Sequence, residues 1–382
     1  MDYNKFGTVI KNGEFLKSIS SEIHDKLHYK TQDDPSIDIN EVCEFFDQRI
    51  KKKGYILWPT SVEINQFVSD YSPAFKQEIG LNDKVSFTLS IDGHKKDKER
   101  YPIKCAYTFP AFGERYLSLI KTVDEACQAG INKSGPDVSL IEVRDVISEV
   151  LESFSMEDSG GSNKVIEGIK TIKGTFGHSL SDNNKIIPST QEISYDDVKR
   201  SSGRMEPNEM YYINVYGTNL AEHEPSYLFD PFPTMFSNTS FDGKHRRKEL
   251  VKAIEMLKKV GRKPKELYDF CYSTYGTTKV YSLRDLMSKY KKTYNSDLKL
   301  IEMRPVSQCG LITGIPTMLI EHDLPKKMKR MGELSELRKK TTDEIELEKI
   351  NKEAKELKKN NSIAVHFGHS IYVTDSGSEI IC

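Results

Sequence analysis

The sequence predicts an α+β fold, because helical and strand-like patterns both occur without regular βαβ alternation. Helical spacing of apolar residues is found at 6–27, 38–54, 114–129 and 139–154. Strand-like alternation is found at 85–89, 103–109 and 211–216. The chain has 382 residues, 37% of them hydrophobic and 10% aromatic. This is enough apolar material for a substantial core in two or three domains, so a disordered protein is excluded.

Two helices are expected before the first strands. The stretch from Phe6 to Leu27 has helical spacing, although Gly7 and Gly13 weaken its start. A second helix follows, with Asp38 as its N-cap and Gly54 at its end.

The cellular compartment follows from features that the sequence lacks. No apolar run reaches the roughly 18 residues of a membrane-spanning helix, and the N-terminus has no signal-peptide pattern. The six cysteines show no C-x-x-C spacing and are interpreted as reduced, mostly buried thiols. We expect a monomeric protein of the cytoplasm, with the nucleus or nucleolus as a further location, and no membrane partner.

Basic residues are concentrated in one segment. The net charge is −1, yet residues 244–299 hold sixteen Lys and Arg against six Asp and Glu. Such an excess favours phosphate binding, with a solvated helix face as the alternative. The candidate RNA-binding residues are Lys244, Arg246, Arg247, Lys248, Lys258, Lys259, Arg262, Lys263, Lys265, Lys289, Lys291 and Lys292.

A second charged segment, residues 326–359, has twelve basic and eight acidic residues with amphipathic spacing on both sides of Thr341. Thr341 to Glu344 matches a capping box. The segment therefore predicts a projecting hairpin of two helices just before the final strand.

Common catalytic motifs are absent, including the P-loop, G-x-S-x-G, H-E-x-x-H and G-x-G-x-x-G patterns. His366 and His369 lie three residues apart in a strand-like stretch, which places them on opposite faces. We interpret them as ordinary strand residues and not as a metal pair.

Several motifs, in order along the chain, resemble those of the type II methionine aminopeptidases. They are Leu57-Trp58-Pro59-Thr60-Ser61-Val62-Glu63-Ile64-Asn65 ending in Tyr71-Ser72-Pro73, Gly177-His178-Ser179-Leu180 with Ile187-Pro188, Tyr212-Ile213-Asn214-Val215-Tyr216-Gly217, and Phe367-Gly368-His369-Ser370-Ile371. The resemblance implies the pita-bread (creatinase/aminopeptidase) fold, with two pseudo-symmetric halves.

The domain boundaries follow from the same resemblance. It implies a body at 1–240, with halves at about 1–110 and 111–240, and a winged-helix-like insertion at 241–300. The chain returns to the body at 301–325. The amphipathic spacing, and not the resemblance, places an extra helical hairpin at 326–360, and the final strand lies in 361–382.

That family holds two metal ions with two Asp, one His and two Glu, since closely spaced divalent ions need anionic ligands. The resemblance places these ligands at Thr88, Lys104, His178, Asn214 and Gly368, and a further catalytic histidine at Asp70. Only His178 is kept. An ammonium about 4 Å from a divalent ion costs roughly 8 kcal/mol at an effective dielectric of about 20. We therefore expect no metal, no cofactor and no peptidase activity. His178 is interpreted as a hydrogen-bonded remnant in a closed or filled pocket, and Trp58 as a core residue.

The inactive branch of this family includes proteins similar to the ErbB3-binding, or proliferation-associated, proteins. The resemblance implies a ribosome-associated factor that binds ribosomal RNA and tunnel-exit proteins of the large subunit through the insertion. Two alternatives stay open: a type II methionine aminopeptidase with an atypical site, and a peptide- or histone-binding protein on the same fold. The sequence leaves open the exact subgroup, the role of the hairpin, peptide binding in the pocket, and action in nuclear assembly or on mature ribosomes.

Overall fold

The computed structural model describes residues 3–33, 37–79, 83–97, 99–110, 116–157, 165–167, 169–172, 175–181, 185–189, 195–218, 226–229, 233–238, 280–295, 297, 312–315, 317–321, 324–341, 344–357 and 363–382. Helices and strands are mixed without βαβ alternation, so the expected α+β class is confirmed. The described helices include none that is both long and apolar enough to cross a membrane.

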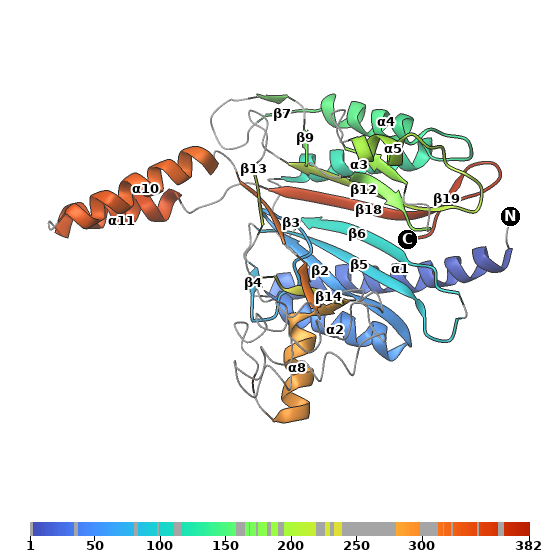
Figure 1. Cartoon of the computed structure of the whole chain (residues 1–382), viewed down its shortest axis with the longest axis horizontal. Coiled ribbons are helices and arrows are strands. Elements are labelled where there is room, and N and C mark those ends of the chain that lie inside the picture. The colour runs from blue at the N-terminus through green and yellow to red at the C-terminus, as the bar shows by residue number, and fades with distance from the viewer. Residues whose placement is uncertain are drawn as a thin grey trace, which may run out of the picture.

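A nine-stranded sheet organises the molecule (Figure 1). Its strands, in spatial order, are β11 (Ile186–Pro188), β10 (Thr175–Ser179), β12 (Met210–Thr218), β18 (Ala364–Val373), β6 (Ile103–Pro110), β5 (Lys84–His94) and β2 (Tyr55–Ile64). Two short strands join from the side, β9 (Lys170–Thr171) on β12 and β19 (Ser378–Ile380) on β18. The long strand β18 pairs antiparallel with β12 on one side and β6 on the other. Strand β18, near the C-terminal end of the chain, therefore joins the two halves of the sheet.

Helices α1 (Tyr3–Asp33) and α2 (Ile39–Lys52) cover the first half of the sheet. Asp38 caps α2 as expected, because its side chain accepts a hydrogen bond from the backbone N–H of Asn40. Gly13 lies where the backbone of Ile381 crosses α1, and a Cβ at this position would lie under 3.0 Å from it. The glycine that weakens the helical pattern is therefore required by close packing.

Helices α3 (Leu117–Lys133) and α4 (Leu140–Glu152) cover the second half, followed by the short α5 (Tyr195–Ser201). Apolar residues of α3 and α4 form one core with β12 and β18. Both helices match the ranges that the sequence predicts to within four residues at each end. Their period of 3.6 residues buries one face on the sheet and leaves the other in water.

Smaller sheets border the large one. β13 (Ser226–Phe229), β17 (Met318–Glu321) and β3 (Phe67–Ser69) form one three-stranded sheet. β15 (Val280–Ser282), β14 (Met235–Asn238) and β16 (Ile312–Ile315) form another, and helix α8 (Leu283–Tyr294) follows β15. Two-stranded pairs are formed by β1 (Ile37–Asp38) with β4 (Glu78–Ile79), and by β7 (Ser155–Glu157) with β8 (Val165–Glu167). The helix expected at 247–260 lies outside the described residues.

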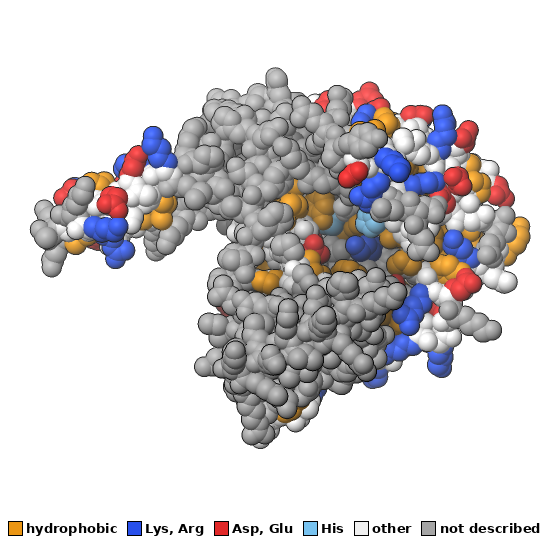
Figure 2. Space-filling view, in the orientation of Figure 1, with side chains coloured by type: hydrophobic (Ala, Val, Ile, Leu, Met, Phe, Trp, Pro, Cys, Tyr) orange, Lys and Arg blue, Asp and Glu red, His pale blue; other side chains and the backbone are white. Residues whose placement is uncertain are grey.

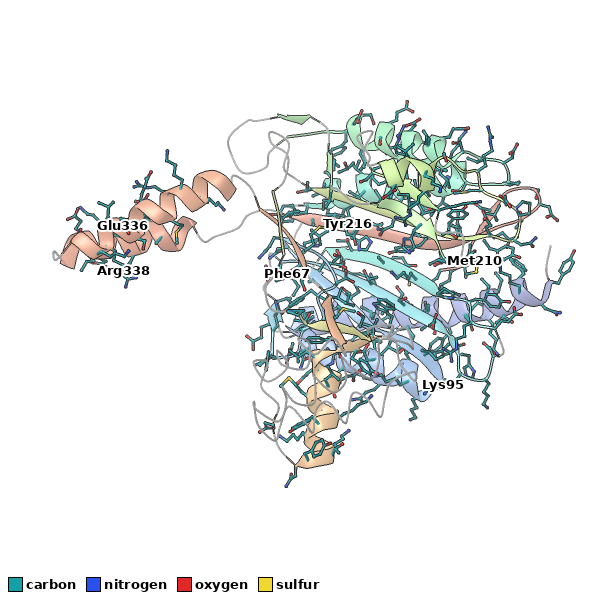
Figure 3. All side chains as sticks on the ribbon, viewed as in Figure 1. Phe67, Lys95, Met210, Tyr216, Glu336 and Arg338 are labelled. Carbon is teal, nitrogen blue, oxygen red and sulfur yellow. The ribbon has the colours of Figure 1, made fainter. Side chains whose placement is uncertain are left out.

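Helices α10 (Leu324–Lys340) and α11 (Glu344–Leu357) project from the body as the hairpin that the sequence predicts (Figure 1). Leu334 and Ile350 are buried between them. Arg330 on α10 donates to Glu353 on α11 at 2.7 Å. Polar residues such as Glu336 and Arg338 point into solvent along the arm (Figure 3).

Candidate functional site

A polar cavity lies on the sheet face that the helices leave uncovered. In β5 the odd-numbered residues from Val85 to Ile91 belong to the core, so the even-numbered ones face the other way. The cavity has a volume of about 240 Å³ and is lined by Trp58, Pro59, Ser61, Glu63, Ser69, Asp70, Thr88, Ser90, Lys104, His178, Tyr212, Asn214, Tyr216, Met318 and His366. Figure 2 shows a hollow in the middle of the molecule, with histidine, basic and acidic side chains at its floor.

His366 is the centre of the hydrogen-bond network in this cavity. Its Nδ1 lies 3.2 Å from a Glu63 oxygen, and its Nε2 lies 2.5 Å from Oδ1 of Asn214 and 3.3 Å from the Tyr212 hydroxyl. Tyr216 stacks on the imidazole, with ring centroids 3.9 Å apart (Figure 3 labels Tyr216). A carboxylate can only accept, so Nδ1 donates to Glu63. Burial lowers the pKa of His366, while Glu63 acts in the opposite direction.

Glu63 receives further donors from neighbouring strands. The Thr88 hydroxyl donates to its Oε1 at 3.0 Å, and the Ser61 hydroxyl does so at 3.5 Å. Thr88, placed at the first Asp of the family, is therefore a donor that stabilises a carboxylate from a different strand. Both carboxylate oxygens of Glu63 are already occupied by protein groups.

A second series of hydrogen bonds links buried polar groups of β5 and β6 to the backbone of His366. Lys84 is buried and donates to the Ser86 hydroxyl at 3.1 Å, which lies 2.7 Å from the Thr108 hydroxyl. Thr108 donates to the backbone oxygen of His366 at 2.8 Å. Burial lowers the pKa of Lys84 to about 7, with Glu63 acting in the opposite direction.

Lys104 reaches the same cavity from β6. Its Nζ lies 5.7 Å from the centre of the Trp58 ring and 5.6 Å from that of Tyr212. Burial lowers the pKa of Lys104, and the nearby Asp70 and Glu63 oppose that effect. Trp58, interpreted from the sequence as a core residue, instead lines the cavity and contacts this ammonium group.

His178 and Asp70 complete the cavity wall. The His178 ring lies edge-on to Tyr212, with centroids 5.6 Å apart. Burial and then Lys104 lower its pKa to about 4, so the imidazole is neutral at pH 7. Asp70 has a left-handed backbone with φ of 58°, and burial raises the pKa of its carboxyl. The expectation that His178 sits in a closed or filled pocket is wrong, because it lines an open cavity.

Gly368 borders the site without contributing a side chain. It pairs with Asn214 on β12 and with Ala106 on β6. A Cβ on Gly368 would lie under 3.0 Å from the ring and hydroxyl of Tyr212. Tyr212 therefore occupies the volume in which the last family carboxylate would lie.

The residues present do not fit the pair of divalent ions that the resemblance implies. Lys104 brings a cation and Tyr212 fills the place of a carboxylate. Throughout the described part of the chain, no three His, Cys, Asp or Glu side chains are grouped as a metal site would need. The donor set favours hydrogen-bonded ligands over a metal ion.

The structure brings together five of the six candidate residues of the former site around one cavity and places the sixth at its border. They are Asp70, Thr88, Lys104, His178 and Asn214, with Gly368 beside them. Sequence reasoning missed Glu63 and wrongly interpreted His366 as an ordinary strand residue, although His369 does lie apart from it, with its ring against Tyr107. The available signal was the two-residue spacing of His366 and Gly368, which puts both on one face of the strand.

The candidate RNA-binding residues are only partly described. Lys244, Arg246, Arg247, Lys248, Lys258, Lys259, Arg262, Lys263 and Lys265 lie outside the described residues. Lys289, Lys291 and Lys292 lie on α8, where Lys291 and Lys292 are exposed and Lys291 pairs with Asp297 at 3.0 Å. Lys289 lies over the ring of Tyr281, with Nζ 5.8 Å from its centroid.

One cation of the basic segment is internal. Arg284 is buried and forms a salt bridge with the buried Asp47 on α2. It also donates to the backbone oxygen of Pro73 at 2.8 Å, and Lys51 on α2 pairs with Asp285 at 2.5 Å. The excess of ten positive charges in 244–299 therefore overstates the charge available to a partner.

The family profile and the individual relatives that match this sequence agree with one another. The profile of metallopeptidase family M24 matches residues 17–226. Methionine aminopeptidase 2 of Debaryomyces hansenii is 27% identical over 216 residues, which cover 52% of this chain and 47% of that protein. Methionine aminopeptidase 2 of Komagataella phaffii is 27% identical over 230 residues, covering 56% and 47%. The chain thus spans about half the length of these relatives.

Solved structures show the same fold. Methionine aminopeptidase from Thermotoga maritima superposes with a TM-score of 0.51 at 13% identity, covering 100% of this chain and 97% of that one. The structure of a thermophilic Arx1 gives a TM-score of 0.56 at 15% identity, covering 95% and 88%. These likenesses confirm the pita-bread fold that the sequence predicts. Because the family profile covers more than half of its residues, the chain is a member of metallopeptidase family M24.

Proposed function

We propose that this protein is a non-catalytic homologue of methionine aminopeptidase that associates with the large ribosomal subunit, contacting ribosomal RNA and tunnel-exit proteins. The strongest support for the loss of catalysis is the pair of residues Lys104 and Tyr212. The first puts an ammonium into the former metal centre, and the second occupies the space of a ligand carboxylate. Within the described residues there is no set of ligands that could hold two metal ions and generate hydroxide.

The RNA-binding part of the proposal is supported by the attachment of α8. The salt bridges of Arg284 with Asp47 and of Asp285 with Lys51 fix the N-terminal end of this helix to α2. Its last turn, with Lys291 and Lys292, points away from that anchor and is exposed. A rigidly held basic helix end, next to a segment rich in Lys and Arg, suits the sequence-independent backbone of A-form RNA.

Co-sedimentation with purified large subunits over a salt series tests ribosome binding. We expect affinity to fall steeply with salt, with each neutralised phosphate contributing about −0.9 to the log–log slope on a duplex. Reversing six charges in the insertion, at Arg246, Arg247, Lys258, Lys259, Arg262 and Lys263, to Glu should abolish co-sedimentation.

The matched control reverses six charges in the hairpin, at Lys326, Lys327, Lys329, Arg338, Lys339 and Lys340, and should leave binding intact. Loss of binding in the hairpin variant alone would show that the hairpin, and not the insertion, makes the contact. Loss in neither variant would refute RNA binding through the insertion. Capture of proteins that survives RNase treatment would instead favour the peptide- or histone-binding alternative.

The loss of catalysis has its own test, since the matched relatives are methionine aminopeptidases. Purified protein incubated with cobalt, manganese or iron should release no methionine from a Met-Ala-Ser peptide. Metal analysis after dialysis should find far less than one ion per chain. Stoichiometric metal together with methionine release would establish the alternative of an atypical peptidase.

A further inference from the structure

Three polar groups on the cavity wall have no hydrogen-bond partner within the described part of the chain. They are the Lys104 ammonium, the Ser90 hydroxyl and the His178 imidazole, all of which line the cavity. Ser90 and Lys104 are direct cross-strand partners on β5 and β6, so their side chains leave the sheet side by side on the same face. Groups of this kind, turned into a cavity without partners, are groups that a ligand can satisfy.

Among the charged groups that line the cavity, Lys104 is the one for which the described residues supply no hydrogen-bond partner. The oxygens of Glu63 are engaged by His366, Thr88 and Ser61. Asp70 accepts a hydrogen bond from Ser69, and burial raises the pKa of its carboxyl. The Lys104 ammonium has the rings of Trp58 and Tyr212 beside it, and Asp70 and Glu63 act on it through their charge without a hydrogen bond within the described residues.

From this arrangement we infer that the cavity binds a small monocarboxylate, whose carboxylate takes hydrogen bonds from Lys104, Ser90 and His178. Its apolar part lies against Trp58 and Met318, which line the same cavity. A volume of about 240 Å³ is below the roughly 300–1,000 Å³ of pockets for drug-sized ligands, so the ligand is a small acid. This inference goes beyond ribosome binding and does not depend on it.

The same charges exclude two other ligand classes. An ammonium-bearing ligand, such as a free peptide N-terminus, would meet the cation of Lys104 in a partly desolvated site. A dianion such as a phosphate monoester would face Asp70 and Glu63 with only one cation to offset it. A single negative charge is therefore the best match for one ammonium group.

Isothermal titration calorimetry of the full chain with three probes of similar size tests the proposal. The probes are 3-phenylpropionate, 3-phenylpropylamine and phenyl phosphate, which share an aromatic ring and differ in charge. We expect saturable binding of the carboxylate and at least tenfold weaker binding of the other two. Equal or tighter binding of the amine or the phosphate, or no binding of 3-phenylpropionate, would overturn the proposal.

Variants identify the groups that bind. Lys104→Met keeps the length of the side chain and should weaken 3-phenylpropionate binding by about tenfold or more, the size expected for a lost charge-assisted hydrogen bond. Ser90→Ala should weaken 3-phenylpropionate binding by a smaller factor. It provides the test if Lys104→Met fails to fold. The exposed Lys95 (labelled in Figure 3) provides the control, because Lys95→Met should leave binding unchanged. Unchanged binding in both cavity variants would place the ligand elsewhere.

Discussion

The Tyr212 side chain occupies the space that any side chain at Gly368 would need. A Cβ at Gly368 would lie under 3.0 Å from both the ring and the hydroxyl of Tyr212. Tyr212 is buried and its hydroxyl lies 3.3 Å from Nε2 of His366, so it cannot move away without breaking that contact. The absence of a side chain at Gly368 and the position of the Tyr212 ring therefore depend on each other.

Returning the family carboxylate to this position should destabilise the protein. Gly368→Glu forces a side chain into the Tyr212 ring and buries a charge, which should cost about 3 kcal/mol or more of unfolding free energy. Urea denaturation followed by circular dichroism measures it. Gly7→Ala, at a helical glycine with nothing near its Cβ, is the control and should be neutral or slightly stabilising.

Combining Gly368→Glu with Tyr212→Ala should recover part of the loss, since the second change empties the contested space. Additive costs in the double variant would show that the two residues do not compete for one volume.

The buried salt bridge between Asp47 and Arg284 should be essential for attaching α8. Arg284→Met leaves the Asp47 carboxylate buried without its partner, which should cost about 3–5 kcal/mol. Arg49→Met removes the more exposed pair with Glu22 and should cost within about 1 kcal/mol. Chemical denaturation of both variants decides the matter, and equal small effects would mean that the buried pair is dispensable.

Periodicity predicted those regular elements that have one face in the core, such as β5, α3 and α4. The alternation in 85–89 and 103–109, and the helical spacing of α3 and α4, were correct. The close approach behind Gly13 could not be predicted, since the residue that requires it, Ile381, is at the other end of the chain.

The site was predicted only in part, because it is formed by residues that lie far apart in the sequence. Motif order located Thr88, Lys104 and His178 around one cavity, yet the partners of Glu63 and His366 come from strands far apart in the sequence. Only the register of the sheet brings such residues together. Likewise, composition cannot distinguish the exposed Lys292 from the buried Arg284, because burial depends on what packs against each.

The helical hairpin should be removable without unfolding the body. Its helices pack on each other through Leu334 and Ile350 and project away from the large sheet (Figure 1). Replacing 326–359 with a short Gly-Ser bridge should leave the cooperative unfolding of the body within about 0.5 kcal/mol of the intact chain. Thermal unfolding followed by circular dichroism measures this. Loss of the cooperative transition would show that the hairpin belongs to the core.

The buried Lys84 should make stability depend on pH above neutrality. Burial lowers its pKa from 10.5 unfolded to about 7 folded, so between these values the unfolded chain binds the proton more tightly. Stability should therefore rise with pH across this window, by an amount on the order of a few kcal/mol when complete, because uncharged Lys84 no longer opposes burial. Urea midpoints from pH 7 to 10 should climb in the wild type and much less in Lys84→Met. Lys95→Met, at an exposed position, should keep the wild-type slope. If Lys84→Met also retains that slope, the dependence originates in another group, and Lys84 remains charged in the folded state.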